Sequence, residues 1–368
     1  RADLFGTERL EHHAQTLAEA QTVASGGPMR VRTLGSRVKE NADTLLRAYR
    51  TCAQALQAGQ TITPAAEWLL DNFHLVEQQL RQIHDDLPPG YYRQLPKLAD
   101  GPFAGYPRVF GLAWAYVAHT DSLMSGPVLA RYVRAYQQVQ PLMIGEIWAV
   151  AITLRIVLIE NMRRLAVQIV DGHALRLRAD AIVDAVLAAR QSPGQSQLAV
   201  MQAAVGPFEA APLPQIVAAQ IAKRLRGFDP LHTPLLGWLE DRLNRQGTTI
   251  EDVVANAQTR LGASNVTMRN IVTSMRLVSE MDWADFFEDV SLVDARLRGD
   301  PTYAAMDFAT RNRYRTEIEI LARGSDLTES AVTDACLTLA AHGVNDHARD
   351  PGHWLSGEGR ATLETTIG

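Results

Sequence analysis

The sequence has few cysteines and no long uninterrupted apolar run, and each absence narrows what the protein can be. Its two cysteines, Cys52 and Cys336, lie far apart among apolar neighbours with helical spacing, which favours free buried thiols over a disulfide or a zinc site. The most apolar stretch, 147–159, contains Arg155 and is shorter than the roughly 20 apolar residues of a transmembrane helix. We therefore expect a buried core helix there and a reducing compartment.

Clustered positive charge is also scarce. The net charge of −5 argues against a dedicated nucleic-acid binder, because affinity for phosphate comes from gathered Lys and Arg side chains. The stretch 30–39 is an exception, with four cations and no acid, and it fits either a solvated face or a contact with anionic lipid headgroups. The chain starts at Arg1 without a signal-peptide pattern, so we expect a piece of a longer protein.

Nearly every part of the sequence repeats its apolar residues at the spacing of a helix. The most regular stripe lies at 69–87, where spacings of four and three alternate. Thr63 and Pro64 before it are typical of a helix cap and a first helical residue. The central apolar helix is expected to end at Gly172, with a further helix at 174–189. No stretch alternates convincingly with period two, so the sequence predicts an all-α fold, a multi-helix bundle or irregular helical array with short capped turns.

Two stretches rich in turn-forming residues interrupt this pattern. The first, 88–108, holds prolines, glycines and aromatic rings and predicts one long aromatic loop. The second, 206–214, holds three prolines and a glycine and is the best candidate for a boundary. We therefore expect an N-terminal helical layer at 1–205, which includes the aromatic loop, and a C-terminal helical layer at 206–368, the two packed as one unit.

The aromatic loop and the helix after it supply the clearest candidates for ligand binding. Sugars present apolar C–H faces that flat rings can cover, and five rings are candidates for such a surface: Tyr91, Tyr92, Phe103, Tyr106 and Trp114. The alternative is that these rings pack the loop onto the helices, as buried aromatic side chains mostly do. Both interpretations remain open from the sequence.

The stretch 306–325 predicts a single capped helix. Asp307 or Thr310 can accept hydrogen bonds from the free amides at its start, and Gly324 can take the left-handed conformation that ends it. One face carries an apolar stripe with a spacing of four and three.

Charged side chains accompany that stripe. Arg311 lies one turn before Tyr314 on the apolar face, so its guanidinium must find a partner or lie along an aromatic ring. A spacing of four predicts ion pairs on the exposed side, Arg313 with Glu317 and Arg315 with Glu319. Arg311, Tyr314 and Arg315 are candidates for an interface with another domain, and a purely structural helix is the alternative.

Catalytic chemistry has weak support in the sequence. Glycoside hydrolysis needs two carboxylates about 5 to 9.5 Å apart, and Glu146 with Glu160, or Asp282 with Asp285 and Glu288, are the pairs to consider. Any helical sequence with 41 acidic residues offers such pairs, so these pairs do not by themselves indicate a glycosidase.

Metal and phosphate sites have no clear pattern either. His342, His347 and His353 lack a metal-ligand spacing and fit a polar tail. There is no Gly-rich loop followed by Lys and Ser or Thr, which a phosphate-binding loop requires.

Short motifs spread over nearly the whole chain resemble the cyclic β-1,2-glucan synthases. The clearest run is 306–324, where Met-Asp-Phe, Thr-Arg, Tyr-Arg and Ile-Glu precede Leu-Ala-Arg-Gly. Further motifs are Asp3-Leu4-Phe5-Gly6 with Glu8-Arg9-Leu10, Tyr91-Tyr92-Arg93-Gln94-Leu95-Pro96, Asp282-Trp283, Phe286-Phe287 and Ser291-Leu292-Val293-Asp294. The resemblance is to the part of those proteins that precedes their first membrane span.

The resemblance implies that the parent protein builds a cyclic glucan from UDP-glucose. Glycosyltransferases of that kind usually hold a divalent metal between aspartates, often as Asp-x-Asp, and processive synthases tend to carry Gln-x-x-Arg-Trp near the acceptor. This sequence contains neither motif. The resemblance therefore places the transferase centre, its UDP-glucose and its metal outside this segment, and we expect no cofactor and no catalytic residue within it.

We therefore expect a non-catalytic helical domain at the cytoplasmic face of the bacterial inner membrane. It would support the transferase module and guide the growing glucan. Its partners would be the transmembrane and glycosyltransferase modules of the same polypeptide, with no nucleic acid among them. A carbohydrate-binding module for β-1,2-glucan is the alternative, and a helical glycosidase is a weaker one.

Overall fold

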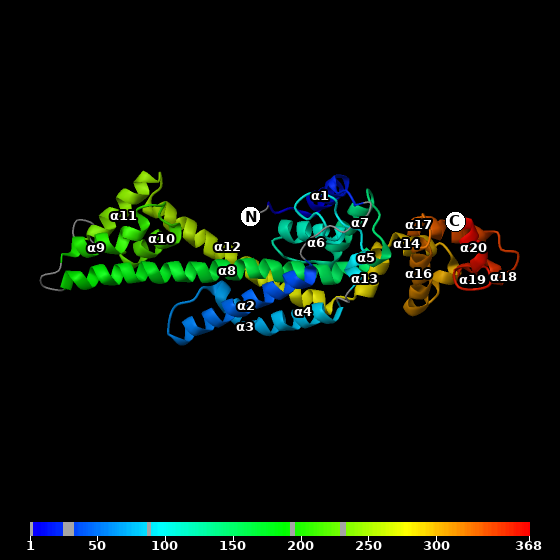
Figure 1. Cartoon of the computed structure of the whole chain (residues 1–368), viewed down its shortest axis with the longest axis horizontal. Helices are drawn as coiled ribbons and strands as arrows, with labels where there is room; N and C mark the ends of the chain where they lie inside the picture. The colour runs from blue at the N-terminus through cyan, green and yellow to red at the C-terminus, as the bar shows by residue number, and fades with distance from the viewer. Residues whose placement is uncertain (1–2, 25–32, 87–89, 192–195, 229–232) are drawn as a thin grey trace. The chain divides into compact units, whose positions relative to one another are not determined.

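The computed structural model describes residues 3–24, 33–86, 90–191, 196–228 and 233–368, without the side chains of 91 and 93. Throughout these ranges the chain is built of helices and forms no strand (Figure 1), which confirms the all-α prediction. Isolated bridges join Val23 to Leu98 and Lys97 to Pro107. Among the described residues, no helix combines the length and apolar character that crossing a membrane requires.

The chain divides into two compact units that interleave along the sequence. Unit 1 consists of Arg1–Leu34, Gln79–Leu158 and Thr273–Gly368, and unit 2 of Gly35–Gln78 and Ile159–Val272. Each unit therefore brings together helices from distant parts of the chain. The predicted division into layers at 1–205 and 206–368 follows chain order and stays a prediction.

Unit 1 contains a buried core of aromatic and aliphatic side chains. Its helices are α1 (Thr7–Ala20), most of α4 (Phe73–Asp86), α5 (Tyr91–Gln94), α6 (Arg108–His119), α7 (Gly126–Gln137), the start of α8 (Ile144–Gln191), the end of α12 (Ile250–Glu280), α13 (Trp283–Val290), α14 (Leu292–Leu297), α15 (Pro301–Ala304), α16 (Phe308–Arg323), α17 (Glu329–Ala341), α18 (Asp346–Arg349), α19 (Pro351–Leu355) and α20 (Arg360–Ile367). The start of α8 is buried on nearly every face, as expected of a helix that is apolar all round.

The predicted aromatic loop is ordered by backbone hydrogen bonds. The Leu98 amide donates to the Tyr106 carbonyl at 2.9 Å, and the Gly105 amide donates back to Leu98 at 2.7 Å. Gly101 and Gly105 have positive φ angles of 75° and 80°, a region that glycine enters without steric cost. The loop is shorter than predicted, because α5 forms a helical turn within it.

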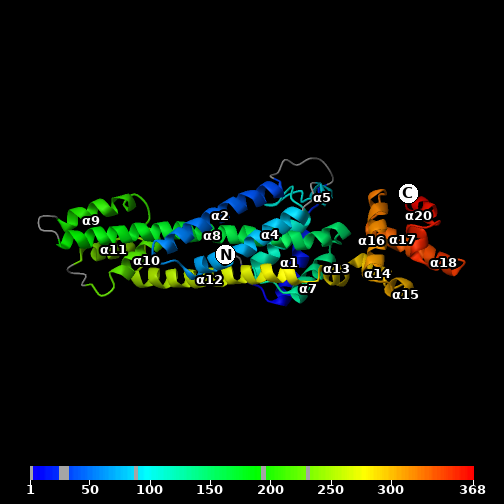
Figure 2. The same cartoon turned by 90° about the horizontal axis from the view of Figure 1, so that it is seen from below.

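Unit 2 is built of α2 (Leu34–Gln57), α3 (Pro64–Asp71), the first part of α4, the rest of α8, α9 (Gln197–Val205), η1 (Gly206–Phe208), α10 (Gln215–Arg224), α11 (Pro234–Arg245) and most of α12. Both views show α2 running beside α8 (Figures 1 and 2), and an ion pair between Arg37 and Glu160 joins the two helices. Thr63 accepts a hydrogen bond from the Ala66 amide, which confirms the predicted cap of α3.

The predicted end of the central helix at Gly172 is wrong. Helix α8 continues through Gly172 to Gln191. Glycine costs a helix interior only about 1 kcal/mol relative to alanine, and good helix formers follow it here. Without a proline or a cap, that cost is too small to end the helix.

The proline-rich stretch 206–214 forms a turn that hydrogen bonds from side chains of α11 fix in place. One nitrogen of Arg242, Nη2, donates to the carbonyls of Phe208, Glu209 and Ala211 at 2.8, 3.1 and 2.6 Å. Trp238 donates its ring N–H to the Glu209 carboxylate at 2.9 Å. These bonds tie the turn to α11 within unit 2.

Candidate functional site

Helix α16 forms as the sequence predicts, and its cap at Asp307 is the one expected, since Asp307 accepts a hydrogen bond from the Thr310 amide at 2.7 Å. The helix ends at Gly324, but the predicted left-handed conformation is wrong: the φ of Gly324 is −89°, and its amide still donates to the carbonyls of Ile320 and Leu321 within the last turn. The buried face consists of Arg315, Ile318, Leu321 and Ala322. An arginine therefore lies at the centre of an otherwise apolar face.

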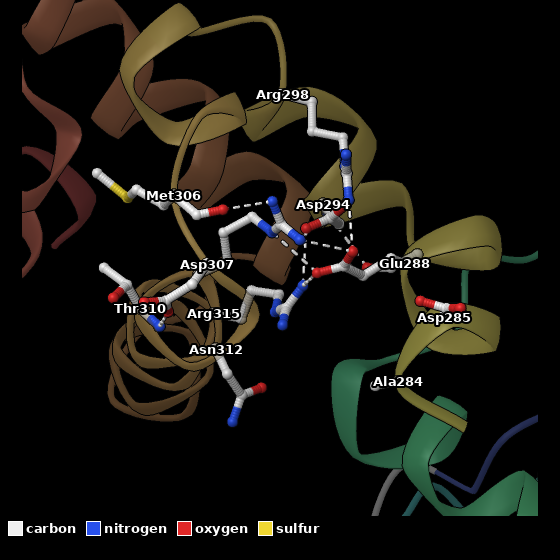
Figure 3. Close-up of polar contacts among 12 residues, drawn as sticks. Ala284, Asp285, Glu288, Asp294, Arg298, Met306, Asp307, Thr310, Asn312 and Arg315 are labelled. Atoms are coloured by element: carbon white, nitrogen blue, oxygen red, sulfur yellow. Dashed lines mark hydrogen bonds and ion pairs between the residues drawn. The ribbon is translucent and has the colours of Figure 1, made fainter. Parts of the chain in front are cut away.

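Five charged side chains from α13, α14 and α16 meet beside that face. We call Glu288, Asp294, Arg298, Arg311 and Arg315 the arginine–carboxylate cluster. Figure 3 shows the side chains of Glu288, Asp294, Arg298 and Arg315 pointing toward one another. Glu288 comes from α13 and Asp294 from α14, while Arg298 directly follows α14. Ion pairs thus join α13, α14 and α16.

Each arginine of the cluster uses its planar group on more than one acceptor. Arg311 binds both oxygens of Glu288, through Nε and Nη2, at 2.9 Å each. Arg298 donates to Asp294 and to Glu288, both at 2.5 Å. Nη1 of Arg315 donates to Asp294 at 2.7 Å and to Glu288 at 3.1 Å. Forked guanidinium geometry is what makes such shared contacts possible.

The centre of the cluster is closed to solvent. The side chains of Arg315 and Asp294 are both 0% exposed. The guanidinium of Arg315 lies 4.9 Å from the ring centre of Phe287 and 4.8 Å from that of Phe308, within the range of cation–π attraction. Its Nε and Nη2 have no hydrogen-bond partner, so the two rings complete its surroundings.

Two further aromatic contacts extend the cluster. Trp148 of α8 stacks on Phe287 with ring centres 4.5 Å apart. Tyr303 donates its hydroxyl to Asp294 at 2.7 Å, and burial together with that hydrogen bond raises the pKa of the Tyr303 phenol. The phenol therefore stays protonated and acts as a donor to the buried carboxylate.

The structure places all three predicted interface residues in contacts inside unit 1. Arg311 and Arg315 belong to the cluster, and Tyr314 donates its hydroxyl to Asp350 at 3.0 Å. A Cβ atom at Gly352 would lie 2.2 Å from the Tyr314 hydroxyl, so a larger residue there would have to displace the Tyr314 ring. Whether these residues also support a neighbouring domain stays a prediction.

The predicted pair of Arg315 with Glu319 is wrong, because Arg315 turns inward to Asp294 while Glu319 binds Arg323. Glu317 binds Arg360 of α20 in place of the predicted Arg313. A spacing of four predicts contacts within one helix only. Here partners on other helices take the place of the predicted ones.

A second buried ion pair lies at the start of α8. Arg108 donates to both oxygens of Glu146, at 3.0 and 2.5 Å, and also to the side chain of Gln140 and the carbonyl of Pro141. The Glu146 side chain is 0% exposed. Burial acts to lower the pKa of Arg108, but the hydrogen bond and charge of Glu146 outweigh it and raise that pKa.

Two further acids weighed for glycoside hydrolysis, Glu160 and Asp282, also have structural roles. Glu160 accepts hydrogen bonds from Arg37 and Asn41 at 2.8 Å each. Burial acts to raise the pKa of Glu160, yet these donors hold it below its usual value, the opposite of what a general acid needs. Asp282 caps α13 by accepting from the amides of Ala284 and Asp285.

Three of the five predicted sugar-binding rings come together around Phe110. Phe103 and Trp114 lie 5.2 Å apart and are half-buried, while Tyr106 is buried and stacks on Phe110. Tyr92 bonds through its hydroxyl to Thr153 at 2.9 Å. The side chain of Tyr91 lies outside the described residues. Packing of the loop is thus shown, and sugar binding stays a prediction.

The predicted polar tail of histidines forms short helices. His347 and His353 lie with ring centres 4.7 Å apart. In the described ranges, no three His, Cys, Asp or Glu side chains are arranged to hold a metal ion.

Two residues, Phe308 and Glu329, have contacts that were not predicted from the sequence. Phe308 was part of a motif only, yet its ring lies against the guanidinium of Arg315 on the same helix. Glu329 is the second, since its side chain accepts a hydrogen bond from the Ile144 amide, 185 positions away. Contacts over such separations leave no trace in local spacing.

No protein-family model matches the chain. Among curated proteins, the cyclic β-(1,2)-glucan synthase NdvB of Rhizobium meliloti (strain 1021) is 38% identical to it over 377 residues. The match covers 100% of this chain and 13% of that relative. The chain is homologous to a segment of a cyclic β-(1,2)-glucan synthase.

The homology confirms the resemblance that the motifs indicate. In this chain, buried charges form ion pairs between neighbouring helices in the arginine–carboxylate cluster and in the pair of Arg108 with Glu146. Its place ahead of a first membrane span stays a prediction.

Proposed function

We propose that the chain is a non-catalytic helical domain of a cyclic β-1,2-glucan synthase and supports the transferase module of the same polypeptide. The arginine–carboxylate cluster carries this proposal, because its buried acids are neutralised by arginines of neighbouring helices. Acids held in this way stabilise the packing of helices and are not offered to a substrate. The homology over the whole chain supplies the link to the synthase.

The parent protein, in this proposal, uses UDP-glucose with a divalent metal. It lies at the cytoplasmic face of the bacterial inner membrane, where its transmembrane and glycosyltransferase modules are the partners of this domain. The metal would favour a separate cluster of oxygen ligands, such as the aspartates of an Asp-x-Asp motif, which this sequence lacks.

The purified chain, given radiolabelled UDP-glucose with Mg²⁺ or Mn²⁺, is expected to make no labelled glucan. The transferase chemistry belongs to other modules in this account, so incorporation should equal that of a boiled sample. Membranes that contain the full-length synthase serve as the positive control. Labelled polymer formed by the well-folded chain alone would contradict the proposal.

A second function, contact with the growing β-1,2-glucan, has support in the aromatic rings of unit 1. Phe103 and Trp114 are only half-buried, so part of each ring is open to a ligand. Phe110 holds both rings in place, which lowers the entropy lost when a sugar stacks on them.

Titration calorimetry with linear β-1,2-linked oligosaccharides is expected to give saturable binding that Trp114→Ala weakens at least tenfold. Stacking on an aromatic ring supplies much of the contact in that case. Trp238→Ala in unit 2 is the matched control and should keep wild-type affinity. A flat titration with folded protein would remove this second function and leave the supporting role intact.

A further inference from the structure

A buried carboxylate joins α17 to the start of α8. Oε2 of Glu329 accepts a hydrogen bond from the amide of Ile144 at 2.7 Å. Ile144 is the first residue of the 48-residue helix α8, and amides in a first helical turn have no partner within their own helix. Glu329 thus caps a helix that is distant in sequence, and it is 6% exposed.

The surroundings of Glu329 provide little compensation for a negative charge. Its second oxygen, Oε1, is buried without a hydrogen-bond partner. The charged groups that act on it are Glu319 and Arg323 of α16 and Glu146 of α8. Arg323 is already bound to Glu319, and Glu146 is bound to Arg108, so the nearby cations are engaged with other carboxylates.

Burial raises the pKa of Glu329 to about 7, against a usual value of 4.5. The amide of Ile144 acts to lower that pKa, the negative charges of Glu319 and Glu146 act to raise it, and Arg323 acts to lower it. The balance favours the protonated acid in the folded chain at mildly acidic pH.

We propose that Glu329 is a proton-controlled latch, which holds α17 to the start of α8 while it is protonated and loosens when it ionises. The protonated acid keeps its carbonyl oxygen as the acceptor for the Ile144 amide and brings no charge into the interior. Ionisation leaves a buried charge close to Glu146 and Glu319. This latch concerns the packing of unit 1 and does not depend on the proposed function.

The sign of the pH dependence follows from the raised pKa. Between pH 4.5 and pH 7 the folded chain binds more protons at Glu329 than the unfolded chain does. The stabilisation from Glu329 is therefore complete below pH 4.5 and is lost as the pH rises through 7. Above pH 8 no further change is expected from this group.

Hydrogen exchange at the start of α8 tests the latch. After correction for the intrinsic exchange rate at each pH, protection of amides 144–147 is expected to fall about tenfold or more between pH 5.5 and pH 8.5. In Glu329→Gln, which keeps a carbonyl acceptor and cannot ionise, protection should stay constant across that range. Glu364→Gln, a surface carboxylate bound to Arg360, is the matched control and should keep the wild-type profile.

A second variant keeps the latch testable if Glu329→Gln fails to fold. Glu319→Gln removes a neighbouring negative charge and releases Arg323, and both changes lower the pKa of Glu329. The fall in protection should therefore be smaller than in the wild type and should end at lower pH. A wild-type profile that is flat from pH 5.5 to 8.5 would overturn the proposal. The same fall in Glu329→Gln as in the wild type would overturn it too.

Discussion

Asp294→Asn is expected to lower the free energy of unfolding by about 3 to 5 kcal/mol, the range found when one partner of a buried ion pair is removed. The Arg315 guanidinium is 0% exposed and would keep only one carboxylate partner, Glu288 at 3.1 Å. Arg298 and Tyr303 would lose a charged acceptor at the same time. Urea unfolding, followed by circular dichroism, measures the change.

Asp285→Asn is the matched control for this substitution. Asp285 is exposed on α13, near the cluster but outside it (Figure 3), so its loss should cost within about 1 kcal/mol, the size of a charge effect at a helix start. The double variant Asp294→Asn with Arg315→Met should lose less stability than the sum of the two single changes, because no unpaired buried charge remains. An Asp294→Asn protein as stable as the wild type would contradict the structural role of the cluster.

Arg108→Met is expected to have the second large effect, also about 3 to 5 kcal/mol. Glu146 is fully buried and would retain only the Met143 amide as a donor, at 3.0 Å. Arg108→Lys should give an intermediate loss, since an ammonium group keeps the charge but cannot span both oxygens of the carboxylate.

The control for Arg108 lies on α7. Arg131 is half-exposed and pairs with Glu11 at the surface, so Arg131→Met should cost less than about 1 kcal/mol. Thermal unfolding of the variants side by side provides the comparison. Equal losses in Arg108→Met and Arg131→Met would show that burial of the ion pair is not what makes it important.

The elements with strong local signals were predictable from the sequence. The cap at Thr63, the helix from Phe308 to Arg323 and the cap at Asp307 all depend on residues within a turn or two of one another. The central helix shows the limit of such signals. Glycine often ends a helix, and Gly172 was predicted to do so. Buried apolar residues lie on both sides of it in α8, and their packing outweighs the cost of one glycine.

The candidate site was predictable only in part. The sequence indicates that Arg311, on the apolar face of α16, needs a partner or an aromatic ring, and Arg311 binds Glu288. Arg315 was expected on the exposed side with Glu319, and it is instead the buried arginine of the cluster. Its partners lie 21 and 27 positions away on other helices, which no helical spacing can reveal. Glu288 was considered as a catalytic acid for the same reason. The sequence shows that a carboxylate is present, but it does not show that Arg311 and Arg315 bind it.

The most direct test of the account is glucan synthesis by the full-length homologous synthase with this segment carrying Asp294→Asn, measured over a range of temperatures. If the buried charges serve the fold, activity should fall together with thermal stability and recover toward the wild-type rate at low temperature. Asp285→Asn should match the wild type throughout. A fully folded Asp294→Asn synthase that makes no glucan at any temperature would contradict the account, because the carboxylate would then act in the chemistry itself.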